Sequence, residues 1–139
     1  MKPTFQIPVS RPAPIPTHLL FRLDADIYAI RLAEVGGVCL TDRPPVHFPY
    51  FHSIQRLDIR TLLHLPRREA GQETGLIFLS SHRLSFGVDS LEDTVALDPH
   101  CADSNGVVHR QGRAILLLDL PTLLRRNQSS ERLEHAEVA

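Results

Sequence analysis

Short apolar runs separated by polar turn residues follow one another along most of this chain. In residues 27–32, Tyr28, Ile30 and Leu32 alternate with Ala29 and Arg31, and this period of two predicts a half-buried strand. Similar short runs bring the total to about ten predicted strands. The other runs cover residues 19–24, 38–40, 53–59, 76–79, 84–88, 91–97, 106–110 and 113–120.

Turn residues organise these runs into hairpins and two short helices. Ala25 and Asp26 predict a hairpin turn between the first two strands, residues 80–83 predict a second, and residues 111–112 predict a tight third one. Leu62, Leu63 and Leu65 next to Arg60 predict one or two helical turns that end at Pro66. Pro121 suits the first turn of a closing helix through Arg126.

Strands at this spacing, with no long helix, predict an all-β barrel or sandwich. The continuous apolar run of residues 115–118 predicts a strand that is buried on both faces, at a junction between two β-layers. The predicted hydrophobic core contains Phe21, Leu23, Ile30, Leu57, Ile59, Ile77, Leu79, Val88, Ile115 and Leu117.

The two ends of the chain differ in composition from its middle. Residues 1–17 contain five prolines and predict an extended, disordered N-terminal arm. Residues 127–139 are polar and predict a disordered tail. The folded domain is therefore expected to span residues 18–126.

Length and charge place the protein in a broad class. Its 139 residues fit one domain, and 15 basic against 16 acidic residues give a net charge of -1, which provides no global attraction to nucleic acid. No stretch approaches the roughly 20 apolar residues of a membrane helix, so no direct membrane insertion is expected. Two cysteines, Cys39 and Cys101, are too few for a disulfide framework. These features predict a cytoplasmic protein.

Catalytic and metal-binding patterns are weak. The eight histidines lack metal-site spacing, and we expect neither a metal nor another cofactor. Asp58, Asp89 and Asp119 each follow an apolar strand residue, and the favoured interpretation is that they cap turns or pair with arginines such as Arg60 or Arg113. The sequence has no Gly-x-Ser-x-Gly and no Gly-rich phosphate loop. The expectation is a protein without enzyme activity.

Three stretches, taken in order, resemble the CheW-like domain, the coupling module of bacterial chemotaxis-type signalling. The first is LFRLDADIYAI at residues 20–30, continued by residues 32–35. The second is LDIRTLL at residues 57–63, and the third is FGVDSLEDTV at residues 86–95. Residues 105–107 and 113–124 complete the pattern as a closing hairpin and helix. The resemblance covers about residues 19–124.

This resemblance implies a fold and a set of partners. The fold would be two packed five-stranded SH3-like β-barrels with a short C-terminal helix. The function would be that of a non-enzymatic scaffold that links chemoreceptor cytoplasmic tips to a CheA-type histidine kinase, and other CheW-like domains are further candidate partners. By family position, Leu32, Val35 and Val88 would line the receptor-binding groove.

The chain departs from the family pattern in one surface segment. Residues 46–56 lack the glycines that flank the family's hairpin, and this segment is shorter. An aromatic, proline-stiffened loop takes its place, and it either covers a barrel end or presents an exposed anchor for a different partner. Partial burial is favoured, with Tyr50 the residue expected to stay accessible because its hydroxyl needs water or a polar partner. The residues proposed for kinase or other partner contacts are Phe48, Tyr50, Phe51, Arg56 and Arg60.

Three functions remain open at this point. The protein is a full coupling protein, or a divergent CheW-like adaptor or array regulator that binds only one of the two partners, or an unrelated small β-barrel enzyme or oligonucleotide-binding domain. The retained apolar groove residues and the altered loop favour receptor binding over kinase binding.

Overall fold

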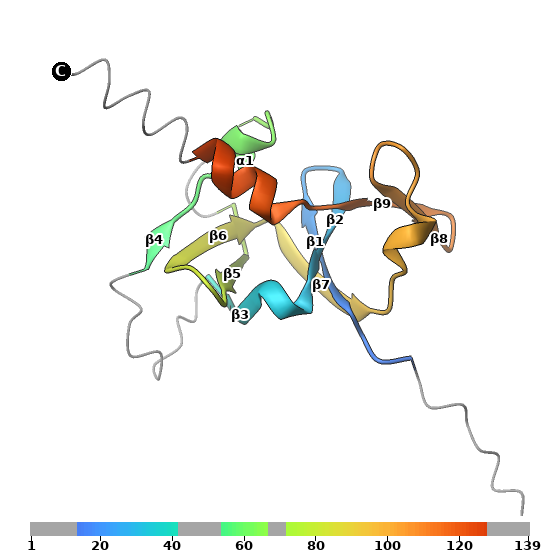
Figure 1. Ribbon diagram of the computed structural model, residues 1–139. Helices are drawn as coiled ribbons and strands as arrows, with labels where there is room; N and C mark the ends of the chain where they lie inside the picture. The colour runs from blue at the N-terminus through green and yellow to red at the C-terminus, as the bar shows by residue number, and fades with distance from the viewer. Residues whose placement is uncertain (1–13, 42–53, 67–71, 128–139) are drawn as a thin grey trace, which may run out of the picture.

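The first sheet combines strands from both ends of the chain. The computed structural model describes residues 14–41, 54–66 and 72–127. In spatial order the strands are β7 (Ser90–Val95), β1 (His18–Leu23), β2 (Asp26–Arg31), β9 (Arg113–Leu117) and β8 (Val107–Arg110). β1 and β2 form an antiparallel hairpin, as do β8 and β9, whereas β2 and β9 pair in parallel. This sheet lies on the right in Figure 1.

The second sheet comes from the middle of the chain. Its order is β3 (Val35–Leu40), β5 (Gly75–Leu79), β6 (Leu84–Val88) and β4 (Gln55–Arg56). The chain enters it through the 3-10 turn η1 (Leu32–Glu34) and returns to the first sheet at Asp89, between β6 and β7. A short helix, α1 (Ile59–Leu62), follows β4, and a second 3-10 turn, η3 (Pro99–Cys101), precedes β8.

The predicted all-β class with paired sheets is confirmed, and three details differ. The turn of the β1–β2 hairpin is one residue earlier than predicted, because Leu23 pairs with Asp26. The predicted strand over residues 53–59 contains only the two residues of β4, since the Asp58 side chain accepts a hydrogen bond from the Thr61 backbone N–H at 3.2 Å and starts α1. Within the described residues the second sheet has four strands, whereas the resemblance implies five.

The main hydrophobic core lies between the two sheets. Phe21 of β1 contacts Phe86 of β6 edge-to-face, with ring centroids 5.6 Å apart, and stacks on Tyr28 of β2 at 5.9 Å. A second, smaller cluster fills the other face of the first sheet and contains Leu20, Ile27, Ala29, Leu97, Val108 and Ile115. β1 and β2 are therefore buried on both faces, which is why Ala29 is a core position and not a surface one.

Residues 115–118, which were predicted to be buried on both faces, pack against a hydrophobic cluster on each side. Leu116 and Leu118 pack against the inter-sheet core, while Ile115 and Leu117 face the smaller cluster. Nine of the ten predicted core residues are buried. The prediction was wrong for Leu117, which is only partly buried because it also borders a surface hollow described below.

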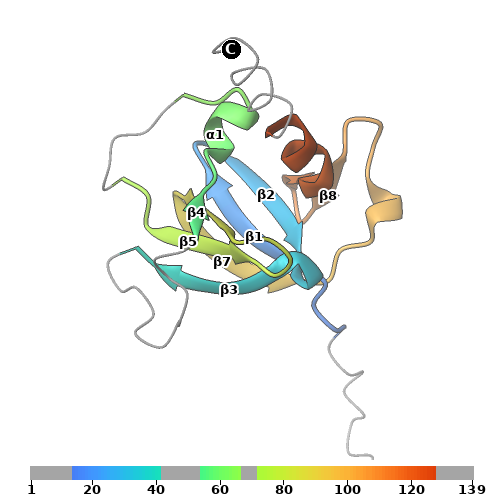
Figure 2. The same ribbon diagram turned by 60° about the vertical axis from the view of Figure 1, so that its left-hand side comes forward.

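A helix over residues 120–127 closes the described chain, as predicted. Asp119 starts it by accepting hydrogen bonds from the Thr122 hydroxyl at 2.7 Å and the Thr122 backbone N–H at 3.3 Å. The Thr122 hydroxyl contact also holds the pKa of Asp119 below its ordinary value. Leu120, Leu123 and Leu124 bury one side of the helix on the inter-sheet core. Figure 2 shows the helix beside α1 at one end of the molecule. No helix in the described ranges is long and apolar enough to cross a membrane.

Replacing Phe86 by Ala should lower the free energy of unfolding by about 3–5 kcal/mol, because it removes a fully buried ring from the inter-sheet core. Urea unfolding of both proteins measures this change. Val38→Ala serves as the control: this residue is 48% exposed, and its loss should shift stability by no more than about 0.5 kcal/mol. Equal effects of the two substitutions would contradict the assigned core.

Candidate functional site

A cluster of ion pairs around Arg60 joins three segments that are distant in sequence. The Arg60 side chain is 5% exposed, and its Nη1 donates to Asp24 Oδ1 at 2.8 Å while its Nη2 donates to Asp89 Oδ1. The other oxygen of Asp89 accepts from the Asp24 backbone N–H at 2.6 Å. Arg60 belongs to α1, Asp24 to the β1–β2 turn and Asp89 to the crossing between β6 and β7. The cluster therefore fastens the second sheet to the first.

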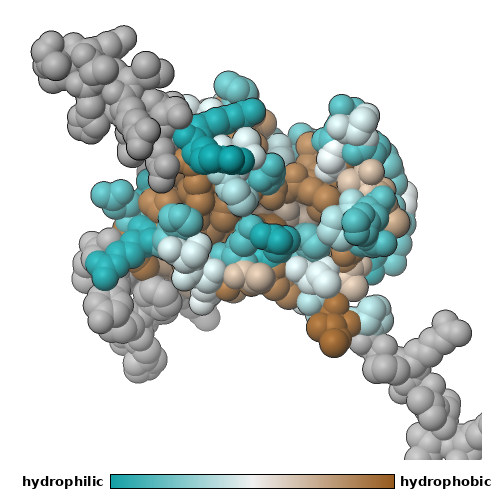
Figure 3. Space-filling view, viewed as in Figure 1, coloured by the Kyte–Doolittle hydropathy of each residue, from teal (hydrophilic) through white to brown (hydrophobic). Residues whose placement is uncertain are grey.

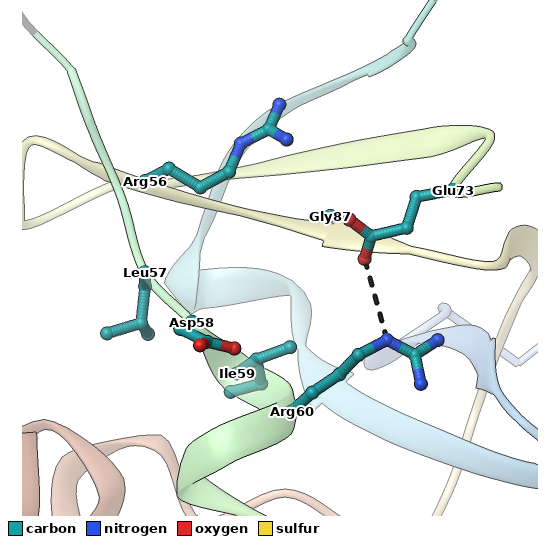
Figure 4. A pocket seen from close by; sticks show the side chains of 7 residues that line it. All are labelled: Arg56, Leu57, Asp58, Ile59, Arg60, Glu73 and Gly87. Atoms are coloured by element: carbon teal, nitrogen blue, oxygen red, sulfur yellow. Dashed lines mark ion pairs between the residues drawn. The ribbon is translucent and has the colours of Figure 1, made fainter. Parts of the chain in front are cut away.

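Arg60 also borders an open pocket of about 290 Å³, lined by Arg56, Leu57, Asp58, Ile59, Arg60, Glu73 and Gly87. The Nε of Arg60 points towards Glu73, 3.8 Å from its Oε2, across the strand that carries Gly87 (Figure 4). Burial alone would lower the pKa of Arg60, but the hydrogen bonds to Asp24 and Asp89 outweigh it and raise the pKa. The guanidinium is thus a permanent charge that the fold uses internally.

The larger concave surface lies where the chain passes between the sheets. One hollow, of about 310 Å³, extends from β2 and β9 to η3, and a second, of about 370 Å³, extends from the β5–β6 turn to the C-terminal helix. Glu34 of η1 and Pro121 line both, so the two hollows adjoin each other, and together they form the groove discussed below. Figure 3 shows apolar side chains in the hollows of this face and polar side chains on the ridges.

The groove has an apolar floor and a few charged groups. Ala29, Leu117 and Leu118 contribute to the first hollow, and Leu120 and Leu124 contribute to the second. The charged or titratable residues that line the groove are His18, Arg31, Glu34, His82, Asp119 and Arg125. Such a surface, apolar with a few polar groups at fixed places, suits a protein segment with one apolar face.

Two charges at the centre of the groove interact directly. Arg31 Nη2 donates to Glu34 Oε1 at 2.8 Å. His18 lies close enough for both charges to influence it: burial lowers the pKa of His18, Arg31 lowers it further, and Glu34 raises it by less. The imidazole is therefore neutral at pH 7, and its Nδ1 contacts the Thr17 hydroxyl at 2.7 Å.

None of the three residues predicted to line a receptor groove forms the lining of this surface. Leu32 and Val35 are partly buried and pack against the inter-sheet core. Val88 is the last residue of β6 and is fully buried in the inter-sheet core, with 0% exposure. Leu32 and Val35 lie on either side of Glu34 in the sequence, and their packing against the inter-sheet core holds η1 in place. A direct contact with a partner stays a prediction for all three.

The residues predicted for kinase or other partner contacts differ in how accessible they are. Phe48, Tyr50 and Phe51 lie outside the described residues. Arg56 is exposed on β4, where a partner can reach it, while Arg60 is buried within its ion pairs. A contact made by any of these residues remains a prediction.

Sequence reasoning missed the groove residues Glu34, Pro121 and Arg125. The sequence placed Pro121 in the first turn of the closing helix but gave no sign of the groove, because the groove forms from segments about 90 residues apart in the chain. The exposed apolar residues of β3 were missed for a similar reason. Val38 and Leu40 are 48% and 47% exposed on this edge strand, and its pairing is visible only in the sheet.

Metal and thiol chemistry have little support among the residues that the structure describes. These residues contain no group of three or more His, Cys, Asp or Glu side chains arranged to hold a metal ion. Cys39 is half-buried, Cys101 is exposed, and neither forms a disulfide. Burial raises the pKa of the Cys39 thiol, which disfavours the reactive thiolate.

Replacing Arg60 by Met should lower the free energy of unfolding by about 3–5 kcal/mol, because the partly buried carboxylates of Asp24 and Asp89 lose their counter-charge. Thermal or urea unfolding measures this loss. The matched control is Arg56→Met in the same pocket, where an exposed side chain should change stability by about 0.5 kcal/mol or less. Full stability of Arg60→Met would show that the ion pairs do not fasten the sheets.

A solved structure provides a match that sequence comparison does not. No family model and no curated protein match this chain. The crystal structure of the scaffolding protein TtCheW from Thermoanaerobacter tengcongensis matches with a TM-score of 0.54 and 13% sequence identity. The match covers 74% of this chain and 88% of that chain. Two paired sheets and a short closing helix, together with this match, show that the chain has a CheW-like fold.

Proposed function

We propose that this protein is a non-enzymatic coupling scaffold of a chemotaxis-like signalling system. The observation that carries the proposal is the apolar groove made by two adjoining hollows at the junction of the two sheets in a CheW-like fold. On this proposal the groove receives the helical cytoplasmic tip of a chemoreceptor, and a separate surface binds a CheA-type histidine kinase. The protein would then act in the cytoplasm, at membrane-associated receptor arrays.

The shape and chemistry of the groove support a helical partner. Its floor carries leucines from β9 and from the C-terminal helix, while polar residues occupy its rims. An amphipathic helix buries one apolar face in such a groove and leaves its polar face in water. The groove residues come from both sheets, so a docked helix would contact both halves of the fold at once.

The edge strand β3 supports the proposed kinase contact. Val38 and Leu40 point outward on a strand that pairs with β5 on one side. Exposed apolar residues on a sheet edge favour association with another β-module, and the resemblance implies that the kinase carries a regulatory domain of the same fold. The predicted contact residues Phe48, Tyr50 and Phe51 come 8 to 11 residues after the end of β3 in the sequence.

The second candidate is an adaptor that binds only one partner. The altered segment of residues 46–56 favours it, because this segment follows β3 in the sequence and lacks the family's glycine-flanked hairpin. In this case receptor binding would persist and kinase binding would be weak or absent. Separate binding measurements with a receptor-tip fragment and a kinase regulatory domain distinguish the two candidates.

Replacing Ser81 by Trp should weaken binding of a chemoreceptor tip fragment by at least about tenfold, because the indole would fill the exposed rim of the second hollow. Isothermal titration calorimetry measures the affinity. Thr94→Trp on the exposed surface of β7 is the control and should bind as the wild type does. Unchanged binding by Ser81→Trp, with its melting temperature preserved, would place the receptor elsewhere.

Replacing Val38 and Leu40 together by Lys should weaken binding of the kinase regulatory domain by at least about tenfold and leave receptor binding unchanged, since two charges replace the apolar edge. Surface plasmon resonance with both partners measures this separation. Both side chains are about half exposed, so the fold should tolerate the change. A loss of receptor binding alone would reverse the assignment of the two surfaces.

A further inference from the structure

A third hollow lies beside the C-terminal helix and adjoins the groove. Its volume is about 420 Å³, larger than that of either hollow of the groove. It shares Leu117, Leu118 and Asp119 with the first hollow. Arg126 lines it, whereas Leu124, two positions earlier in the helix, lines the second hollow, so these two hollows lie on opposite sides of the helix. A segment seated in the groove therefore has access to a further concave surface.

A buried tyrosine forms part of the wall of the third hollow, and its hydroxyl has no hydrogen-bond partner within the described residues. Tyr28 is 7% exposed, and its ring stacks on Phe21 in the inter-sheet core. Its oxygen still has accessible surface, in contrast to the enclosed unpaired atoms of Glu34, Arg60 and Arg110. Buried tyrosine hydroxyls usually have a hydrogen-bond partner, and in the unbound protein water in the hollow would have to supply one. A polar group that enters the hollow can take the place of that water.

The hydroxyl is neutral and has a second neutral polar group beside the same hollow. Burial raises the pKa of Tyr28, and the charges of Asp26 and Asp24 raise it further, so the hydroxyl keeps its proton at pH 7. It can therefore donate one hydrogen bond and accept others. The side-chain amide of Asn105, an exposed residue that also lines the hollow, both donates and accepts and forms no hydrogen bond within the described ranges.

The charges of the third hollow favour neither a cation nor an anion. Its lining contains one acid, Asp119, and one base, Arg126. The two oxygens of Asp119 accept from the backbone N–H and the hydroxyl of Thr122, so this carboxylate is already used to start the helix. The apolar part of the lining consists of leucines from three parts of the chain, namely Leu63, Leu116, Leu117, Leu118 and Leu123. The hollow thus combines an apolar wall with neutral groups that donate and accept.

We propose that the third hollow is a side-chain pocket that takes a neutral amide, Gln or Asn, from the receptor helix docked in the groove. The Tyr28 hydroxyl donates to the amide oxygen, the Asn105 side chain pairs with the amide nitrogen, and the aliphatic stem packs on the leucines. An amide presents an acceptor and a donor at the end of an apolar stem, which matches this lining. The inference rests on the proposed receptor-binding function of the groove.

The test compares the full chain with Tyr28→Phe, which removes the hydroxyl and keeps the buried ring. The probe is a chemoreceptor cytoplasmic tip fragment encoded in the same genome. Calorimetry should give an affinity for Tyr28→Phe that is about three- to tenfold lower, the effect of one lost hydrogen bond. The melting temperature of the unbound variant should stay equal or rise, since the hydroxyl has no partner among the described residues. Thr94→Val, which removes an exposed hydroxyl from β7, is the control and should leave the affinity unchanged.

A second measurement identifies the amide from the partner's side and leaves this chain intact. Each Gln of the tip fragment is replaced by Met and each Asn by Leu, which keep the approximate size of the side chain. One replacement should weaken binding to the wild type but not to Tyr28→Phe. A lower affinity of Tyr28→Phe that is coupled to none of these replacements would overturn the assignment of an amide.

The remaining outcomes separate this pocket from the proposed function. Tight wild-type binding that Tyr28→Phe does not change would overturn the role of the third hollow and leave receptor binding standing. Absence of binding by the wild type and by every variant would instead overturn receptor binding, and the pocket with it.

Discussion

The packing of the two sheets across Phe21 and Phe86 is the constraint on which the rest of this structure depends. It buries both faces of β1 and β2, so the centre of the first sheet serves two cores at once. The C-terminal helix and α1 then cover the end of the inter-sheet core with leucines. The groove exists because neither the sheets nor these helices close the junction completely.

Arg60 gives this packing its orientation. Apolar contacts are non-directional, whereas a guanidinium fixed between Asp24 and Asp89 has one geometry. The ion pairs lie where the chain returns from the second sheet to the first, so a rotation of one sheet against the other would break them. Breaking a buried pair costs far more than an exposed one, so this cluster resists such a rotation.

The proposed scaffold function follows from one geometric fact: η1 lies between the sheets and borders both hollows. A partner in this groove would contact elements from both sheets, and the kinase surface proposed on β3 begins at the end of η1. Any change in the position of η1 would therefore reach both proposed binding surfaces, which suits a protein that couples two partners. Arg60 is used inside the fold, so Arg56 is the exposed arginine of the pocket that both residues line.

The sequence by itself determined the strands, two of the three hairpin turns, the closing helix and nearly all of the core, because period-two patterns and turn residues act locally. The turn at Asp24 and the start of α1 at Asp58 were placed wrongly. The pairing of β1 with β2 decides where the turn lies, and the side-chain cap of Asp58 starts a helix where the apolar pattern alone predicted a strand. Only the tertiary structure decided that Arg60 is internal, that Leu117 reaches a surface and that Glu34 borders both hollows. Each of these depends on segments far apart in the chain meeting at one point, and no local pattern encodes that meeting.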